Sequence, residues 1–271
     1  MEKKFDLLKV IRIVVVIVLL AIVVYEAMMI YRDQKEYKTA DNEYESISNK
    51  YVRDAGVKKA EETADDANSD DNNADITYPD LEINFEELKS VNSDFIGWLY
   101  FPAVDVSYPV VRENEINQYL YTTFEGKSNK AGSIYMDVLS YSDFTGYSDM
   151  LFGHNMKNGS MFGSLKKIYQ SKDEDILADN PYIYVYTEDG VRIYRVFAYY
   201  ITTDGSYSYT EVTNEKEYED YISYIKKNSI YTFPEDVSFD GCPSLLTLST
   251  CQGQSGSGKR FVVHSVFLKK A

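Results

Sequence analysis

The chain opens with an apolar run long enough to cross a membrane. Residues 13–31 are apolar apart from Glu26, and four basic residues lie between positions 3 and 12. A spanning helix needs about 20 such residues, and basic residues before the run with acidic sequence after it place the N-terminus in the cytoplasm. A cleaved signal peptide is the alternative, but its apolar region is shorter and an A-x-A-like site follows it. We therefore expect residues 1–31 to form a cytoplasmic end and an uncleaved transmembrane anchor, with the rest of the chain outside the cell.

The next segment, residues 32–78, is highly charged. Its first half, up to Ala60, mixes both signs and is compatible with a helix that continues the membrane helix into water. Its second half, residues 61–75, carries seven acidic residues and no basic one. Such a composition cannot bury enough apolar surface to offset its conformational entropy. We therefore expect residues 32–78 to be an acidic flexible stalk that contributes nothing to catalysis.

From Tyr78 onwards the pattern becomes globular, which places a single domain at residues 79–271. Helical periodicity predicts a short helix at 81–92 and another at 214–227. Runs bounded by Gly, Pro, Asn and Asp predict eight strands, at residues 95–101, 104–111, 132–136, 149–152, 182–186, 191–201, 244–250 and 260–268. Many short strands in one domain are typical of a closed β-barrel or a sandwich, so the fold class is mainly β.

Composition narrows the range of functions. The chain has 28 basic and 43 acidic residues, a formal net charge of −15, which argues against a nucleic-acid partner because such partners require a basic surface. It has two histidines, too few for a His-rich metal centre, and we expect neither a metal nor a cofactor. Its 26 tyrosines favour strands over a helical bundle.

Cys251 is the candidate nucleophile. It ends an apolar, β-branched strand and precedes a loop rich in Gly and Ser, so its thiol is approachable. A disulfide with Cys242 is disfavoured, because the extended run from Leu245 to Cys251 covers about 20 Å at ~3.3 Å per residue. A disulfide requires Cα atoms about 5–6 Å apart. We therefore expect Cys251 to be a free thiol rather than half of a disulfide or a buried structural residue.

A cysteine nucleophile needs a proton carrier and a donor for the oxyanion. Arg260 opens the strand that follows Cys251, so a hairpin-like return brings its guanidinium beside the sulfur. His154 lies in a polar loop that leaves a strand, whereas His264 lies within a strand. Catalytic groups favour loops held by a rigid scaffold. The pattern favours His154 but leaves His264 open.

Several segments together resemble the class B sortases of Gram-positive bacteria. The carrying motifs are TLSTC at residues 247–251 with Arg260 downstream, and FGHN at residues 152–155. YPVV at 108–111, GSIYMD at 132–137 and MF at 161–162 are also similar to class B, so the resemblance covers about residues 92–268. Two departures are Phe152, where the family usually has Tyr, and the Gly- and Ser-rich loop between Cys251 and Arg260, which puts the signal preference in doubt.

The resemblance implies a closed eight-stranded sortase-type β-barrel and a membrane-anchored cysteine transpeptidase. Cys251 matches the nucleophile, His154 the general acid and base, and Arg260 the ligand of the oxyanion or substrate carbonyl. Leu120, Tyr207, Ser249 and Thr250 match positions that line the substrate groove. The enzyme would cleave a C-terminal sorting signal after Thr through a thioester and transfer the protein to an amine of the cell wall or of a pilin.

Two other classes of function remain open. A secreted cysteine peptidase or peptidoglycan hydrolase can use the same Cys and His, although such enzymes more often orient the His with Asn, Asp or a second His. An anchored adhesin is the non-enzymatic alternative, in which the free thiol has no catalytic role.

Overall fold

The structure is a computed structural model that describes residues 7–60, 76–171, 176–253 and 256–271. Its helices are α1 (Leu7–Tyr51), α2 (Phe85–Val91), α3 (Lys167–Gln170) and α4 (Glu215–Asn228), with 3-10 turns η3 (Pro102–Val104) and η4 (Tyr207–Tyr209). Its strands are β1 (Val52–Lys59), β2 (Thr77–Ile83), β3 (Phe95–Phe101), β4 (Val106–Arg112), β5 (Ile134–Met136), β6 (Asp149–Phe152), β7 (Tyr182–Thr187), β8 (Gly190–Thr203), β9 (Leu245–Cys251) and β10 (Lys259–Lys270).

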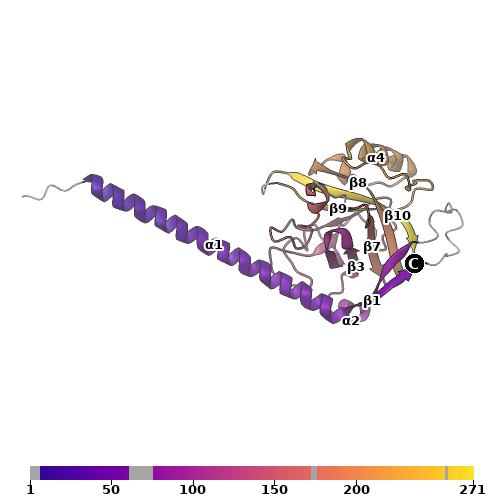
Figure 1. Cartoon of the computed structure of the whole chain (residues 1–271), viewed down its shortest axis with the longest axis horizontal. Helices are drawn as coiled ribbons and strands as arrows, with labels where there is room; N and C mark the ends of the chain where they lie inside the picture. Colours follow the sequence, from indigo (N-terminus) through magenta and orange to yellow (C-terminus); the bar gives the residue numbers. More distant parts are fainter. Residues whose placement is uncertain (1–6, 61–75, 172–175, 254–255) are drawn as a thin grey trace, which may run out of the picture.

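Eight of these strands close into a barrel (Figure 1). Their order is β10, β8, β7, β3, β4, β5, β6 and β9, and β9 pairs with β10 to complete the circle. The pairs β4–β5 and β6–β9 are parallel and the others antiparallel. The expected closed eight-stranded barrel is therefore confirmed, with each strand end within two residues of its predicted position.

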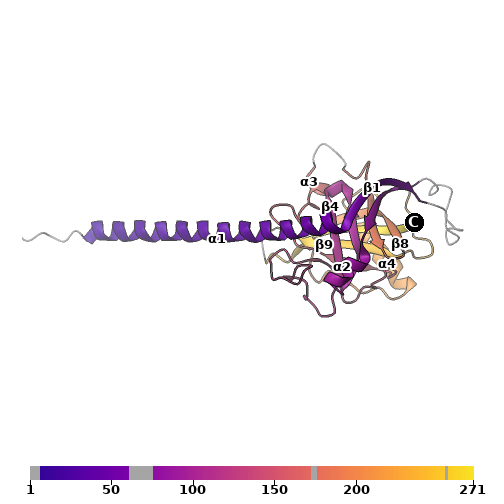
Figure 2. The same ribbon diagram turned by 90° about the horizontal axis from the view of Figure 1, so that it is seen from below.

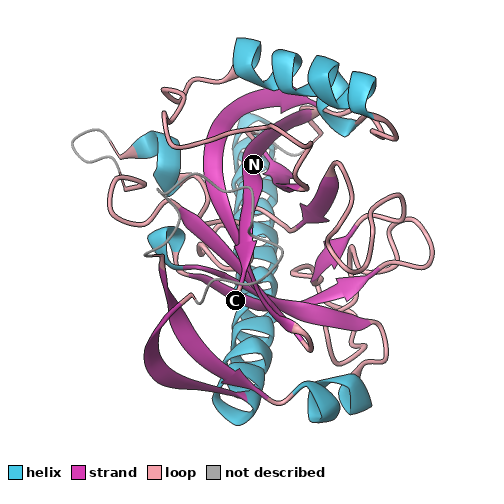
Figure 3. Cartoon of the chain, turned by 90° about the vertical axis from the view of Figure 1, so that its right-hand side faces the viewer, coloured by secondary structure: helices cyan, strands magenta, loops and turns pink. Residues whose placement is uncertain are grey.

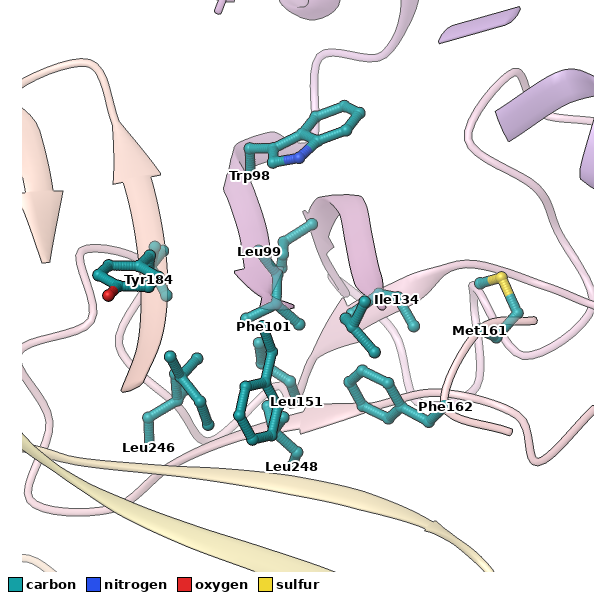
Figure 4. Close-up of a cluster of buried hydrophobic side chains, with 14 of the residues drawn as sticks. Trp98, Leu99, Phe101, Ile134, Leu151, Met161, Phe162, Tyr184, Leu246 and Leu248 are labelled. Carbon is teal, nitrogen blue, oxygen red and sulfur yellow. The ribbon is translucent and has the colours of Figure 1, made fainter. Parts of the chain in front are cut away.

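The barrel interior is filled by one face of each strand. Side chains alternate between the two faces of a strand, so every second residue points inward. Figure 4 shows Phe101, Ile134, Leu151, Leu246 and Leu248 meeting there, and all five are fully buried. Burying a large apolar side chain contributes about 1.5–3 kcal/mol. This core holds the ends of β6 and β9, where the candidate site lies, in a fixed relation.

The helix expected before the cysteine strand is present as α4. Asn214 is its N-cap: the side chain accepts a hydrogen bond from the backbone N–H of Glu217. The helix packs on the outside of the barrel and lies across the top of the molecule in Figure 3. The face predicted from helical periodicity is the buried one, comprising Tyr218, Tyr221, Ile222 and Ile225.

The N-terminal apolar run is part of a much longer helix. Within the described residues, the helix from Leu8 to Tyr51 contains an 18-residue window with mean hydropathy 3.0 and no burial against the protein. By length and composition it can cross a membrane. Figure 1 shows this end of α1 projecting well beyond the barrel, while its other end lies along the barrel.

Residues 32–60 differ from the flexible stalk that the sequence suggested. The second half of α1 packs on the barrel through Ala40, Tyr44, Ile47 and Tyr51, all less than 9% exposed. These positions recur every three or four residues and so form one helical stripe. Charged and polar residues occupy the positions between them, so the sequence resembles a solvated helix. The acidic segment 61–75 lies outside the described residues.

The helix expected at residues 81–92 is present only in its second half. α2 begins at Phe85 after the Asn84 cap, whereas the preceding residues form β2. β2 pairs antiparallel with β1, with Val52 opposite Ile83. Residues 60–76 separate β1 from β2. The helical periodicity of residues 81–92 therefore gave no sign that the first of them would pair with β1.

Candidate active site

Cys251 is presented at the end of a buried strand. The first six residues of β9 are buried and Cys251 is exposed. Leu246 and Leu248 point into the barrel, so alternation places Ser249 and Cys251 on the outer face. Both cysteines of the described residues are free. The barrel therefore positions an accessible thiol at a rigid strand end.

Arg260 lies directly opposite Cys251. The antiparallel register of β9 and β10 pairs these two residues. Directly opposed residues put their side chains on the same face with Cβ atoms about 4.5–5.5 Å apart. The guanidinium donates to the Lys259 carbonyl at 3.2 Å and to the Asp204 carboxylate at 3.4 Å. The hairpin-like return predicted from the sequence thus brings this cation beside the sulfur.

His154 reaches the same face from a strand far away in the sequence. β6 runs parallel to β9 with Phe152 beside Ser249. The chain continues alongside β9 beyond the strand end: the Gly153 N–H donates to the Ser249 carbonyl at 3.2 Å, and Asn155 Nδ2 donates to the Cys251 carbonyl at 2.8 Å. Alternation then places His154 on the outer side with Cys251. The structure therefore brings His154, Cys251 and Arg260 together.

Gly153 allows this close approach. A Cβ atom there would come within 2.5 Å of Ile134 and 2.7 Å of the Phe162 ring. Thr250 Oγ1 also donates to the Gly153 carbonyl at 2.7 Å, which ties the His154 segment to the cysteine strand. A side chain at position 153 would push the histidine away from β9.

The surroundings of His154 determine its protonation. Its Nε2 lies 2.7 Å from the Leu120 carbonyl oxygen, and its ring stacks on Tyr121 with centroids 5.5 Å apart. A carbonyl only accepts hydrogen bonds, so Nε2 carries a proton and Nδ1 is the free nitrogen of the neutral ring. Burial lowers the pKa of His154, and the Leu120 hydrogen bond partly opposes this. The ring is thus kept mainly neutral at neutral pH, with Nδ1 available to take a proton.

His264, the alternative left open by the sequence, has a different environment. It is fully buried outside the barrel interior, between Thr247 Oγ1 at 2.9 Å from Nδ1 and the Tyr200 hydroxyl at 3.1 Å from Nε2. Both ring nitrogens are therefore occupied. Burial lowers the pKa of His264 to about 3. These contacts indicate a structural histidine that joins β8, β9 and β10.

Replacing His264 with glutamine is expected to make the free energy of unfolding fall less steeply as the pH is lowered. The unfolded histidine titrates near 6.5, above the folded value of about 3. The unfolded chain therefore takes up the proton first as the pH falls. Stability from the neutral residue is fully present above about pH 6.5 and declines below it by at most about 1.4 kcal/mol per pH unit. The test compares the free energy of unfolding of wild type and His264→Gln from pH 7 to pH 4; equal slopes would contradict the expectation.

The four residues matched to the substrate groove lie in different settings. Leu120 presents its carbonyl to His154, and Ser249 shares the outer face of Cys251. Thr250 is buried and bonded to Gly153. Tyr207 is partly exposed and packs against Tyr221 and Tyr224 of α4. Leu120 therefore adjoins His154, whereas Ser249 precedes Cys251 on β9 and is fully buried, and Tyr207 stands next to α4.

The sequence did not point to Tyr209, which contacts the cysteine strand directly, whereas Tyr207 packs on α4. The Tyr209 hydroxyl bonds Ser249 Oγ at 2.8 Å and its ring stacks on Phe152 with centroids 6.2 Å apart. A pocket of about 190 Å³ opens beside these two rings, between the β5–β6 and η4–α4 loops, with Asp137 and Glu211 in its walls. Nothing in the sequence distinguishes Tyr209 among the 26 tyrosines.

No group of three or more His, Cys, Asp or Glu side chains with a metal-binding arrangement occurs within the described ranges. The chemistry that the site offers is that of a thiol, an imidazole and a guanidinium on one face of a barrel. Such a set can form and resolve a covalent acyl intermediate.

Comparisons with known proteins agree with this geometry. A family model described as the sortase domain matches residues 99–267. Sortase B of Listeria monocytogenes is 34% identical over 188 residues, which cover 68% of this chain and 74% of that protein. Sortase B of Staphylococcus aureus is 30% identical over 191 residues, which cover 68% of this chain and 75% of that protein.

Solved structures are also similar to this chain. Sortase B from B. anthracis has a TM-score of 0.67 and 25% identity, and the match covers 87% of this chain and 99% of that one. A Staphylococcus aureus sortase B–substrate complex has a TM-score of 0.61 and 27% identity, and the match covers 68% of this chain and 84% of that one.

Proposed function

Because this chain belongs to the sortase family and is a cysteine transpeptidase of the sortase B type, we propose that Cys251 attacks a threonine carbonyl in a C-terminal sorting signal. The sulfur–carbon bond forms as the peptide C–N bond breaks, which leaves a thioester and releases the tail beyond the threonine. An amine from the cell wall or from a pilin then attacks the thioester, and the thiolate leaves as the new amide forms.

His154 carries the proton through both halves of this reaction. In the first half Nδ1 accepts the Cys251 proton and delivers it to the departing amine. In the second half it accepts a proton from the incoming amine and returns it to the thiolate. The Leu120 carbonyl keeps Nε2 protonated, so the ring exchanges protons through one nitrogen only. The lowered pKa of His154 favours the neutral ring that begins each cycle.

Arg260 stabilises the charge that develops on the substrate carbonyl oxygen. Its cross-strand position opposite Cys251 supports this role, because the attacked carbonyl must lie beside the sulfur. The guanidinium is a rigid planar fork that stays charged at any working pH. Asp204, its exposed partner at 3.4 Å, orients the guanidinium from the side of β8.

Arg260→Lys is expected to be nearly as damaging as Arg260→Ala. Lysine keeps the charge but offers a mobile point donor in place of the fork. Loss of one oxyanion donor lowers kcat by about 10²–10³. The measurement is single-turnover acylation by a sorting-signal peptide in wild type and both variants. If lysine retains most of the activity, Arg260 acts through its charge alone; near-wild-type rates in both variants would remove it from the mechanism.

The substrate groove runs along the outer face beside Cys251. Leu120 beside His154 and the exposed Tyr207 on η4 support the family assignment of these two residues to signal binding. Ser249 is fully buried and bonded to Tyr209, so it would shape the groove through that ring. Thr250 supports the groove indirectly through Gly153. The partners are secreted proteins that bear a sorting signal and an amine acceptor, with no nucleic acid and no cofactor.

The helix α1 anchors the enzyme in the cell membrane by a single pass, with the N-terminus in the cytoplasm and the barrel outside. The apolar window of α1 and the basic residues before it support this topology. In Figures 1 and 2 the start of β10, in yellow, lies on the side of the barrel from which α1 projects, and it pairs with the end of β9. The site at the end of β9 therefore faces the membrane, where secreted proteins emerge.

The observation that carries the function is the pairing of Cys251 with Arg260 at one strand end, with the His154 segment bonded along the same strand. The test incubates the full chain in detergent with a sorting-signal peptide, with and without an amine acceptor. Transfer to the amine and accumulation of a Cys251 thioester without it are expected. Cleavage that is indifferent to the amine would indicate a cysteine hydrolase, and no reaction with any signal peptide would refute the proposal.

A further inference from the structure

Most of the hydrogen bonds and ion pairs between the second half of α1 and the barrel go to one loop. That loop, residues 119–133, leads from β4 to β5 and contains Leu120 and Tyr121, which hold His154. Figure 2 shows α1 lying across the barrel on this side. The helix that carries the membrane anchor therefore packs on the loop that orients the catalytic histidine.

The contacts are polar, directional and numerous. Tyr44 donates to the Gly132 carbonyl at 2.6 Å and accepts from the Phe124 N–H at 3.3 Å. The buried Glu43 accepts from the Glu125 N–H at 3.2 Å. Further along the helix, the Glu36 carbonyl accepts from Asn129, Lys130 pairs with Asp33 and Glu36, and Asp41 accepts from Asn158 in the loop after His154.

Two residues of this loop, Gly132 and Leu120, connect Tyr44 to His154. Gly132, which accepts the Tyr44 hydrogen bond, has a positive φ of 57°, and a Cβ there would come within 2.4 Å of the Leu120 carbonyl oxygen. The backbone at Gly132 is thus packed directly against the oxygen that holds His154 Nε2. The Ser133 N–H also donates to the Tyr119 carbonyl at 3.1 Å, which joins the two ends of the loop.

We propose that Tyr44 is a positioning residue that holds the Leu120 carbonyl against His154. The hydroxyl fixes Gly132, Gly132 supports the Leu120 carbonyl, and that carbonyl orients the imidazole. The inference rests on the proposed function for the role of His154 in the reaction, but the positioning itself does not depend on it. The membrane helix thereby becomes a part of the active site's support rather than a passive tether.

The matched variants are Tyr44→Phe and Tyr37→Phe. The first removes one hydroxyl and keeps the ring, which packs edge-on against Tyr108 with centroids 5.4 Å apart. Tyr37 lies two turns earlier on α1, is half-buried against the core, and makes no side-chain hydrogen bond to the described residues. The same atom is therefore removed from the same helix at a position whose hydroxyl makes no hydrogen bond to Gly132.

The first measurement is exchange of the His154 Nε2 proton with water, followed by NMR on the full chain in detergent with labelled histidine. The chain has two histidines, and the buried His264 serves as the internal reference for an intact barrel. A lost hydrogen bond changes an opening equilibrium by about three- to tenfold. We expect exchange to be faster by this factor in Tyr44→Phe, and unchanged in Tyr37→Phe and at His264.

The second measurement separates positioning from binding. We expect kcat for acylation to fall about three- to tenfold in Tyr44→Phe with KM unchanged, because the histidine acts in the chemical step. Wild-type exchange and wild-type kcat in Tyr44→Phe would overturn the inference, as would equal effects in Tyr37→Phe. If the wild type acylates no signal peptide, the proposed function fails, whereas the proton exchange still decides the role of Tyr44.

Discussion

Replacing Cys251 with alanine is expected to abolish acylation, while the same replacement at Cys242 leaves it close to wild type. Cys251 is the exposed thiol beside Arg260 and His154, whereas Cys242 lies in the turn before β9 and packs near α4. Burial raises the pKa of Cys242, which disfavours its reactive thiolate. Loss of the nucleophile costs about 10⁶ in kcat for enzymes that act through a covalent acyl intermediate.

Cys242→Ala is the matched control for Cys251→Ala, because each variant removes one thiol and keeps the other. Intact mass of the protein after incubation with a signal peptide reports the thioester directly, and a mild nucleophile should remove the added mass. The wild type and Cys242→Ala are expected to carry the acyl group and Cys251→Ala to carry none. An acylated Cys251→Ala protein would place the nucleophile elsewhere and overturn the proposed reaction.

His154→Ala is expected to lower acylation by about 10²–10⁴, the usual contribution of a general acid and base. The proton of Cys251 then has no positioned acceptor, and the departing amine no positioned donor. His264→Gln is expected to acylate at nearly the wild-type rate once its lower stability is allowed for. The contrast follows from the surroundings of the two rings: Nδ1 of His154 is free for proton transfer, whereas both nitrogens of His264 are bonded within the protein.

The pH dependence gives a second measure of the same residue. Because burial lowers the pKa of His154, the neutral ring persists below the ordinary value of about 6.5. The acid limb of the acylation rate is therefore expected below pH 6.5, and it should disappear in His154→Ala. A folded His264→Gln protein without activity, beside an active His154→Ala protein, would reverse the assignment of the two histidines.

The strands of the barrel could be predicted because each is a local pattern. β3, β6 and β9 are short apolar runs between turn residues, and α4 shows its buried stripe of tyrosines and isoleucines within 14 residues. Alternation along β9 and β10 also places Cys251 and Arg260 near each other, since only a short loop separates the two strands. Periods of two and of 3.6 residues are properties of the backbone and are visible in any window of sequence.

The docking of α1 and the start of β2 could not be predicted in the same way. The residues that α1 buries are separated by charged positions, so the stripe from Ala40 to Tyr51 is sparse and resembles a solvated helix. β2 exists because it hydrogen-bonds to β1. In both cases the stabilising contacts come from distant segments, and local propensity is a weak guide when tertiary contacts compete with it.

The sequence by itself predicted an accessible Cys251 with Arg260 nearby, the strands and the apolar N-terminal helix, because each depends on residues close together in the chain. The local pattern left two histidines open and the family resemblance favoured His154; the tertiary structure shows how that residue comes to lie beside Cys251. His154 is almost a hundred residues away, and the parallel pairing of β6 with β9 brings it there. The Leu120 carbonyl that orients it and the Tyr44 hydroxyl beneath that loop belong to two further segments. Backbone carbonyls carry no sequence signature, and a hydrogen bond to one is set by the path of the chain in space.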